Sequence, residues 1–267
     1  DPVDYYKKWS IKKGEGSPIF EAIGEGTEGS AMTLDSCGLD EALEKGSKTF
    51  GWTERRKKYE SREEYKEGKR KVHGVGMACF MQGSAVPKVD MASAYMKMND
   101  DGSFNLHMGA TDIGTGSDTI LAQMASEVLD VPIEKMIVLS SDTDLTPFDV
   151  GAYASSTTYV SGNAVLKAAK DLKERMITEA ARILGIEVEK VGFDGKEFWD
   201  EESDKSISLI DLSNQITYSH EQKQLQVTSS YVGHKSPPPF MAGFIEIEID
   251  KETFEIDILH YVSVVDC

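Results

Sequence analysis

Two segments of the chain combine glycine with hydroxyl side chains at the start of a helical pattern, which suits ligand binding. The first, residues 109–119, reads GATDIGTGSDT and leads directly into an amphipathic helix. Gly114 and Gly116 would let a ligand approach the main chain, where the first helical amides present the positive end of the helix dipole. An anion or a polar heterocycle fits such a place. Because the same residues also make a tight turn with Ser117 as N-cap, this segment alone is a weak signal.

The second segment, residues 151–158, reads GAYASSTT and precedes another long helical pattern. Four consecutive hydroxyl residues lower helix propensity, so we infer that something other than propensity placed them there. Two hydroxyl-rich helix starts can converge on one extended, phosphate-bearing ligand without any Lys or Arg. The segments therefore predict a shared site that binds through hydroxyls and main-chain amides.

The overall charge of the chain agrees with a site of this kind. The 267 residues include 46 Asp and Glu against 29 Lys and Arg, a formal net charge of -17. Such a chain repels phosphate backbones and anionic lipid surfaces, so we expect neither nucleic acid nor a membrane as partner. The three cysteines form no CxxC pair, which favours a reducing cytoplasm over a disulfide framework.

Other familiar kinds of chemistry lack their motifs. The five histidines are far apart, with no HxxxH or HxH pair, so we expect no metal ligated by side chains of this chain. The sequence has no GxSxG elbow, no Walker loop and no GxGxxG after a first strand, which disfavours serine hydrolysis, ATP and NAD. A redox function would have to import its metal.

The pattern along the chain predicts an α+β (α/β-like) fold of mixed sheets packed against long helices. Residues 1–70 read as a charged helical lead-in and connector, and residues 71–267 as an α/β region that is incomplete at its C-terminal end. A strand pair is expected over 91–98 and 103–108, around an Asn-Asp-Asp-Gly turn.

Two helices and a second strand pair complete this prediction. Apolar residues at helical spacing indicate helices over 117–130 and 155–184. Alternating apolar and acidic residues indicate a half-exposed hairpin over 244–250 and 255–260, with Glu246 and Glu248 facing solvent. Apolar strand residues at 264–267 predict an exposed edge and an obligate heteromer.

Residues 109–125 (GATDIGTGSDTILAQMA) and 151–164 (GAYASSTTYVSGNA) together resemble the molybdopterin-binding domain of the xanthine dehydrogenase and aldehyde oxidase family of molybdenum hydroxylases. Further blocks agree in order: residues 1–52, residues 74–76 and residues 237–267. The resemblance therefore spans nearly the whole chain, and ordered blocks are more specific than any one of them.

The resemblance implies a molybdopterin cofactor whose dithiolene holds molybdenum, often extended by a cytosine nucleotide. No protein ligand to the metal is then expected. By position, the resemblance assigns cofactor contacts to Gly114, Thr115, Gly116, Ser117, Tyr153, Ala154, Ser155, Thr157 and Thr158. Thr115 departs from the Gln commonly found at its place, a change that would shift one pterin hydrogen bond.

The resemblance also implies an oxidoreductase that hydroxylates an N-heterocycle or aldehyde with water-derived oxygen, as part of a larger complex and not alone. Iron–sulfur clusters, with or without FAD, would lie on partner chains. The family's general base is a Glu expected outside this chain, so no catalytic residue is assigned here. The alternative is a non-catalytic assembly or partner module of the same fold that binds no molybdenum.

Overall fold

The structure is a computed structural model that describes residues 1–22, 32–60, 65 and 68–266. It divides into two compact units, each treated by itself below: unit 1 comprises Asp1–Ser84 with Pro237–Cys267, and unit 2 comprises Ala85–Ser236. Both contain helices packed on sheets, so the predicted α+β class with mixed sheets is confirmed. The boundary predicted after residue 70 falls directly before the first strand of unit 1. Within the described residues, no helix is long and apolar enough to cross a membrane.

Unit 1 is built on an antiparallel sheet of order β1-β9-β10. Its strands are β1 (Lys71–Met81), β9 (Phe240–Asp250) and β10 (Ile256–Asp266). Its helices are α1 (Pro2–Trp9), α2 (Pro18–Ala22), α3 (Leu39–Phe50) and α4 (Trp52–Glu60). The predicted C-terminal hairpin is confirmed, since β9 and β10 pair over their whole lengths with one bulge.

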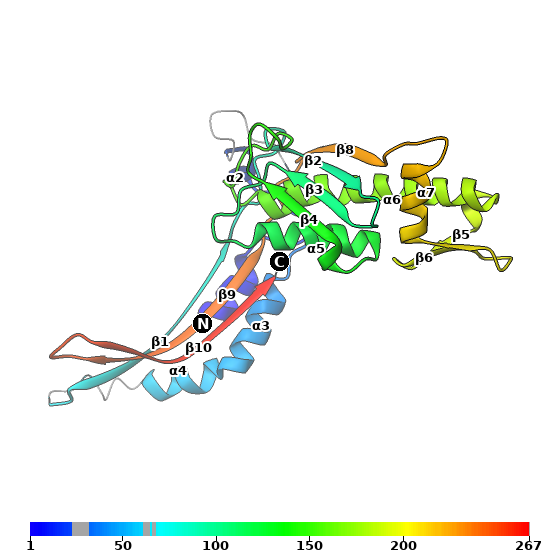
Figure 1. Cartoon of the computed structure of the whole chain (residues 1–267). Coiled ribbons are helices and arrows are strands. Elements are labelled where there is room, and N and C mark those ends of the chain that lie inside the picture. The colour runs from blue at the N-terminus through cyan, green and yellow to red at the C-terminus, as the bar shows by residue number, and fades with distance from the viewer. Residues whose placement is uncertain (23–31, 61–64, 66–67, 267) are drawn as a thin grey trace. The chain divides into compact units, whose positions relative to one another are not determined.

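The core of unit 1 lies where α3 packs against β9 and β10 (Figure 1). The rings of Phe50 and Phe244 lie 5.8 Å apart, and the Trp52 ring meets Phe244 edge-on at 5.7 Å. All three side chains are buried. A methyl group at Gly46 would lie 2.4 Å from the Phe244 ring, so only glycine allows α3 to approach the sheet this closely.

The sheet of unit 1 reverses the predicted orientation of its acidic residues, and the solvent-facing prediction for Glu246 is wrong. Glu246 is only 3% exposed; it accepts a hydrogen bond of 2.6 Å from the Tyr59 hydroxyl and pairs with Arg55. Glu248 is also partly covered, because it pairs with Lys71 and lies 2.9 Å from the His73 ring nitrogen. Cations and donors from α4 and β1 make the covered face the polar one.

Unit 2 contains a four-stranded sheet of order β4-β3-β2-β8. Its strands are β2 (Met91–Met98), β3 (Phe104–Met108), β4 (Met136–Ser140) and β8 (Gln226–Val232). β2 and β3 pair antiparallel as predicted, and β4 joins β3 in parallel. A smaller sheet and a helix follow: β5 (Val191–Phe193), β6 (Glu197–Asp200), β7 (Ser206–Ser208) and α7 (Leu209–Tyr218).

Two helices pack side by side on the larger sheet of unit 2, as Figure 1 shows. α5 (Ser117–Leu129) contacts β4, and α6 (Gly162–Leu184) contacts β2 and β8. The apolar face predicted for the longer helix is confirmed, since its members are fully buried: Val165, Ala168, Ala169, Leu172 and Met176. The predicted start of this helix near residue 155 is wrong, because a π-helical turn over Thr157–Ser161 precedes it.

The close approach at Gly46 yields a first prediction. Gly46→Ala should lower the free energy of unfolding by about 1–3 kcal/mol, because the added methyl overlaps a fully buried ring. The better helix propensity of Ala offsets only about 1 kcal/mol of this. Thr49→Ala, at an exposed position of the same helix, is the matched control and should change stability by about 0.5 kcal/mol or less. Equal urea midpoints for the two variants would contradict the packing argument.

Candidate functional site

The two hydroxyl-rich segments come together in unit 2 around one pocket of about 420 Å³, called here the hydroxyl pocket. Its lining residues are Ile113, Thr115, Ser117, Ile120, Ala152, Tyr153, Ala154, Ser155, Ser156, Thr157 and Thr158. Seven of the nine predicted contact residues are in this lining, and Gly114 and Gly116 belong to the same turn as Thr115. The structure thus brings together segments that lie about forty residues apart in the chain.

The first wall is the turn between β3 and α5, and a carboxylate fixes its shape. One oxygen of Asp112 accepts hydrogen bonds from the amides of Gly114 at 2.8 Å and Gly116 at 3.1 Å. These backbone bonds, the Gly114 bond foremost, hold the pKa of Asp112 below its ordinary value. Both glycines have positive φ, 96° and 74°, and a methyl at either would meet no atom within 4 Å. The main chain is therefore open to a ligand here.

The start of α5 carries a buried polar group without a partner. Gly116 is the N-cap, not Ser117 as the tight-turn interpretation had it, and no side chain caps the helix. The Ser117 hydroxyl is buried and has no hydrogen-bond partner among the described residues, and the same holds for one oxygen of Asp118. An unsatisfied buried group of this kind costs about 1–3 kcal/mol. Because Ser117 lines the pocket, a ligand bound there could satisfy its hydroxyl.

The second wall is the loop that leads into α6. Ala154 and Ser155 both adopt left-handed backbone conformations, with φ of 48° and 53°, which is costly for residues other than glycine. The loop is held there by a bond of 2.8 Å from the Ala85 amide to the Ala154 carbonyl. The Tyr153 hydroxyl also donates to the fully buried Asp90. This strain, maintained by surrounding bonds, is typical of ligand-binding loops.

A π-helical turn continues this wall. Thr157–Ser161 forms the turn, and the buried Ser156 before it donates its hydroxyl to the Tyr153 carbonyl at 2.8 Å. Thr157 and Thr158 line the pocket from within the turn. π-helical turns are rare and frequent at functional sites, because they displace the side chains of one turn from the regular helix.

One glycine and one carboxylate hold the two walls together. A methyl group at Gly109 would lie 2.5 Å from the Pro147 carbonyl oxygen and 2.7 Å from the Asp149 Cβ. Asp149 in turn accepts from the Gly151 amide at 2.9 Å and from the Ser161 hydroxyl at 2.6 Å. The end of the first strand and the start of the second loop thus meet without a side chain between them.

The chemistry of the pocket is that of hydroxyls and amides. None of its lining residues is a Lys, Arg or His. Among the described residues, no group of three or more His, Cys, Asp and Glu side chains is arranged to hold a metal ion. The pocket can hold a polar or phosphate-bearing ligand through main-chain amides near the positive end of α5 and through hydroxyls.

The sequence analysis did not single out four residues that shape the pocket. Ser156 lines it, and Asp90, Asp112 and Asp149 fix the surrounding loops. The order Asp-x-Gly occurs at both turns, at Asp112 and at Asp149, and an Asp that bonds the amide two residues on is a known turn signal. That repeated signal could have identified the latter two, whereas nothing local marks Asp90.

The pKa of Asp112 yields a second prediction. Because folding depresses this pKa, the carboxylate stabilises the fold above the unfolded value near about 4, and that stability is lost as pH falls through the folded pKa. Asp112→Ala should therefore lower the free energy of unfolding at neutral pH, and its difference from wild type should shrink below about pH 4. Thr115→Ala, which removes no titrating group, should show a difference independent of pH. Parallel urea titrations at several pH values check this, and an Asp112→Ala difference that is constant with pH would refute it.

The chain has relatives among proteins of known family. The profile of the molybdopterin cofactor-binding domain matches residues 45–267. The xanthine dehydrogenase molybdenum-binding subunit of Escherichia coli is 34% identical over 272 residues, which cover 100% of this chain and 34% of that protein. The carbon monoxide dehydrogenase large chain of Afipia carboxidovorans is 25% identical over 248 residues, 87% of this chain and 31% of that protein.

The fold has a close counterpart in a solved structure. The CO dehydrogenase of Oligotropha carboxidovorans superimposes with a TM-score of 0.85 at 23% identity, over 100% of this chain and 34% of that chain. The first curated relatives are likewise longer, since this chain spans from 27% to 34% of their lengths. The family profile and the fold agree with the motifs at the two walls of the hydroxyl pocket, and the chain belongs to the molybdopterin cofactor-binding domain family of the molybdenum hydroxylases.

Proposed function

We propose that this chain is part of the molybdenum-cofactor-binding subunit of a xanthine-dehydrogenase-type hydroxylase, and that the hydroxyl pocket holds the phosphate-bearing part of its cofactor. The observation that carries this proposal is the buried, unpartnered Ser117 hydroxyl, beside a main chain left open at Gly114 and Gly116. A donor that costs free energy in the empty fold is well explained by an acceptor that the bound cofactor supplies.

The residues of the two walls would share the binding. Amides and hydroxyls from Gly114 to Ser117 would hold the cofactor at the positive end of α5. Hydroxyls of Ser155, Thr157 and Thr158 would face it from the second wall, and the strained loop at Tyr153 and Ala154 would set their positions. The fit is chemical: the pocket offers neutral donors, and none of its lining side chains is positively charged.

The bound cofactor would supply the molybdenum at which the substrate is hydroxylated with water-derived oxygen. The chain's own residues would hold and orient this group, which matters because small errors in position cost large factors in rate. We assign no general base here and propose that a Glu from another part of the enzyme supplies it.

The remaining parts of the proposal follow from the family. We propose a small substrate, an N-heterocycle or an aldehyde, a cofactor in its cytosine dinucleotide form and a cytoplasmic enzyme. Iron–sulfur clusters, and FAD where present, would lie on partner subunits and carry electrons away. Support for a multi-subunit enzyme comes from relatives whose names describe them as a subunit or a large chain.

Ser117 yields the third prediction. In the full enzyme, Ser117→Ala should lower the molybdenum and pterin content per chain, as a loss of about tenfold or more in cofactor affinity, because a hydrogen bond to a charged group is worth about 1.5–3 kcal/mol. Without cofactor the same variant should be as stable as wild type or more so, since it removes a buried hydroxyl that has no partner. Elemental mass spectrometry, pterin fluorescence and thermal unfolding measure these effects.

Ser126→Ala on the same helix is the matched control. The Ser126 hydroxyl donates to the Val131 carbonyl, so its loss should destabilise the fold by about 1 kcal/mol and leave cofactor content unchanged. Unchanged molybdenum in Ser117→Ala would remove Ser117 from the site. Absence of molybdenum and pterin from the intact wild-type complex would favour the alternative, a non-catalytic partner module of the same fold.

A further inference from the structure

The part of the unit 1 sheet around the β9–β10 turn has two faces of opposite character. Directly paired residues of neighbouring strands lie on the same face of a sheet. Val72 pairs with Ile249 and Ile249 with Ile256, while Ile247 pairs with Ile258. These five residues form one apolar surface, called here the isoleucine face.

The other face carries the charges and the helical cover. Lys71, His73, Glu246, Glu248 and Asp250 alternate with the isoleucine face along β1 and β9. Their ion pairs and hydrogen bonds are satisfied within unit 1 by each other and by Arg55, Tyr59 and Arg70. The polar face thus has its partners already, and the apolar face does not gain cover by turning inward.

Side chains of the isoleucine face are exposed where β10 begins. Ile256 is 59% and Ile258 is 65% exposed, and Leu259 and Tyr261 farther along the strand are 48% and 54% exposed. A contiguous apolar surface on an edge strand is a liability in water unless another molecule covers it. The alternation that usually puts polar residues outside is here inverted.

The turn that leads into β10 presents one more apolar side chain. Phe254 is 78% exposed and adopts a φ of 60°, a left-handed conformation that a bulky residue rarely takes. Its amide donates to the Asp250 carbonyl at 2.8 Å. Glycine or asparagine would serve this turn better, so turn formation does not account for the phenylalanine.

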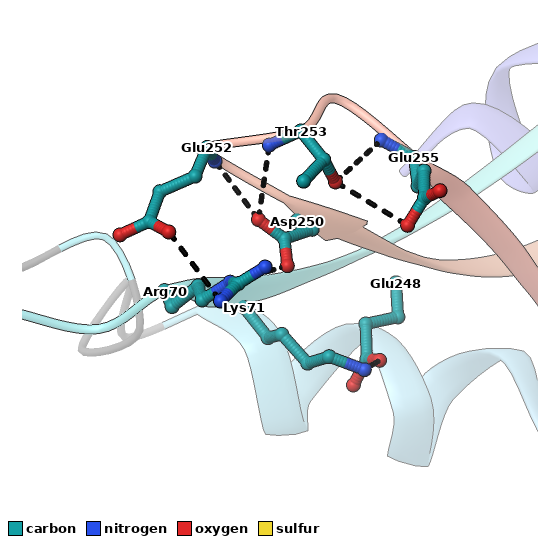
Figure 2. Close-up of polar contacts among 7 residues, drawn as sticks. All are labelled: Arg70, Lys71, Glu248, Asp250, Glu252, Thr253 and Glu255. Carbon is teal, nitrogen blue, oxygen red and sulfur yellow. Dashed lines mark hydrogen bonds and ion pairs between the residues drawn. The ribbon is translucent and has the colours of Figure 1, made fainter.

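A polar network holds this turn in place, as Figure 2 shows. The Asp250 carboxylate accepts from the amides of Glu252 at 2.9 Å and Thr253 at 3.2 Å, and from the Arg70 guanidinium at 2.5 Å. Arg70 also pairs with Glu252 at 3.4 Å. A turn fixed in this way displays Phe254 with little entropy left to lose on binding, which is a property of binding anchors.

The charge beside this surface has one sign. Residues 252–266, which contain the end of the turn and β10, include four carboxylates and no Lys or Arg. Those on the exposed turn and early strand are Glu252, Glu255 and Asp257. A binding partner must therefore bring Lys or Arg to the edge of its apolar contact, because like charges would repel.

We propose that Phe254 and the isoleucine face dock onto a partner subunit of different sequence, whose contact surface is an apolar pocket bordered by Lys or Arg. The geometry comes from unit 1 alone, and only the statement that the partner is another subunit rests on the proposed function. The acidic edge disfavours both a second copy of this chain and an anionic lipid surface.

The fourth prediction tests this surface in the intact complex. A p-benzoylphenylalanine photocrosslinker in place of Ile258 should crosslink to one segment of a different subunit, rich in apolar residues and containing Lys or Arg. The same crosslinker in place of Lys71, on the opposite face, is the matched control and should give none. Phe254→Gly, added to the first variant, should lower the crosslink yield about tenfold or more while leaving the melting temperature unchanged or higher, since glycine relieves the turn.

Several outcomes would overturn the proposal. These are no crosslink, a crosslink within the same chain, to a second copy or to lipid, equal yields from both faces, or a yield unaffected by Phe254→Gly. Molybdenum content measured on the same preparations separates this proposal from the proposed function, because the hydroxyl pocket lies in unit 2.

Discussion

The absence of a side chain at Gly109 is the constraint on which the hydroxyl pocket depends. With even a methyl group there, the end of β3 could not lie against Pro147 and Asp149 at the distances observed. That contact brings the glycine-rich turn next to the loop that precedes α6. Asp149 then uses its two carboxylate oxygens to hold Gly151 and Ser161, so the second wall keeps its shape.

The pocket manages an electrostatic problem that the composition creates. A chain with a net charge of -17 does not attract phosphate through its general field. Short-range donors can still bind phosphate, because amides at a helix start and hydroxyls act over hydrogen-bond distance. The unpartnered Ser117 hydroxyl shows that the fold maintains such a donor at a cost in stability.

The sheet of unit 1 shows how alternation can be read correctly and still be placed on the wrong face. The pattern from Phe244 to Asp250 correctly predicts a strand that pairs with its successor. It does not say which set faces solvent, because that depends on what covers the sheet. Arg55 and Tyr59 come from α4, nearly two hundred residues earlier, and they draw Glu246 inward.

The sequence by itself determined the α+β class, the hairpin of β2 and β3, the apolar face of α6 and two ligand-type segments, because period, turn residues and local spacing carry them. Local patterns could not predict the short strands β5, β6 and β7, or the π-helical turn that delays α6. Only the tertiary structure decided that the segments share one pocket, that Ser117 is left unpartnered, and that Asp90 supports Tyr153. The reason is physical: these features depend on contacts between residues distant in the chain, whose partners no local pattern specifies.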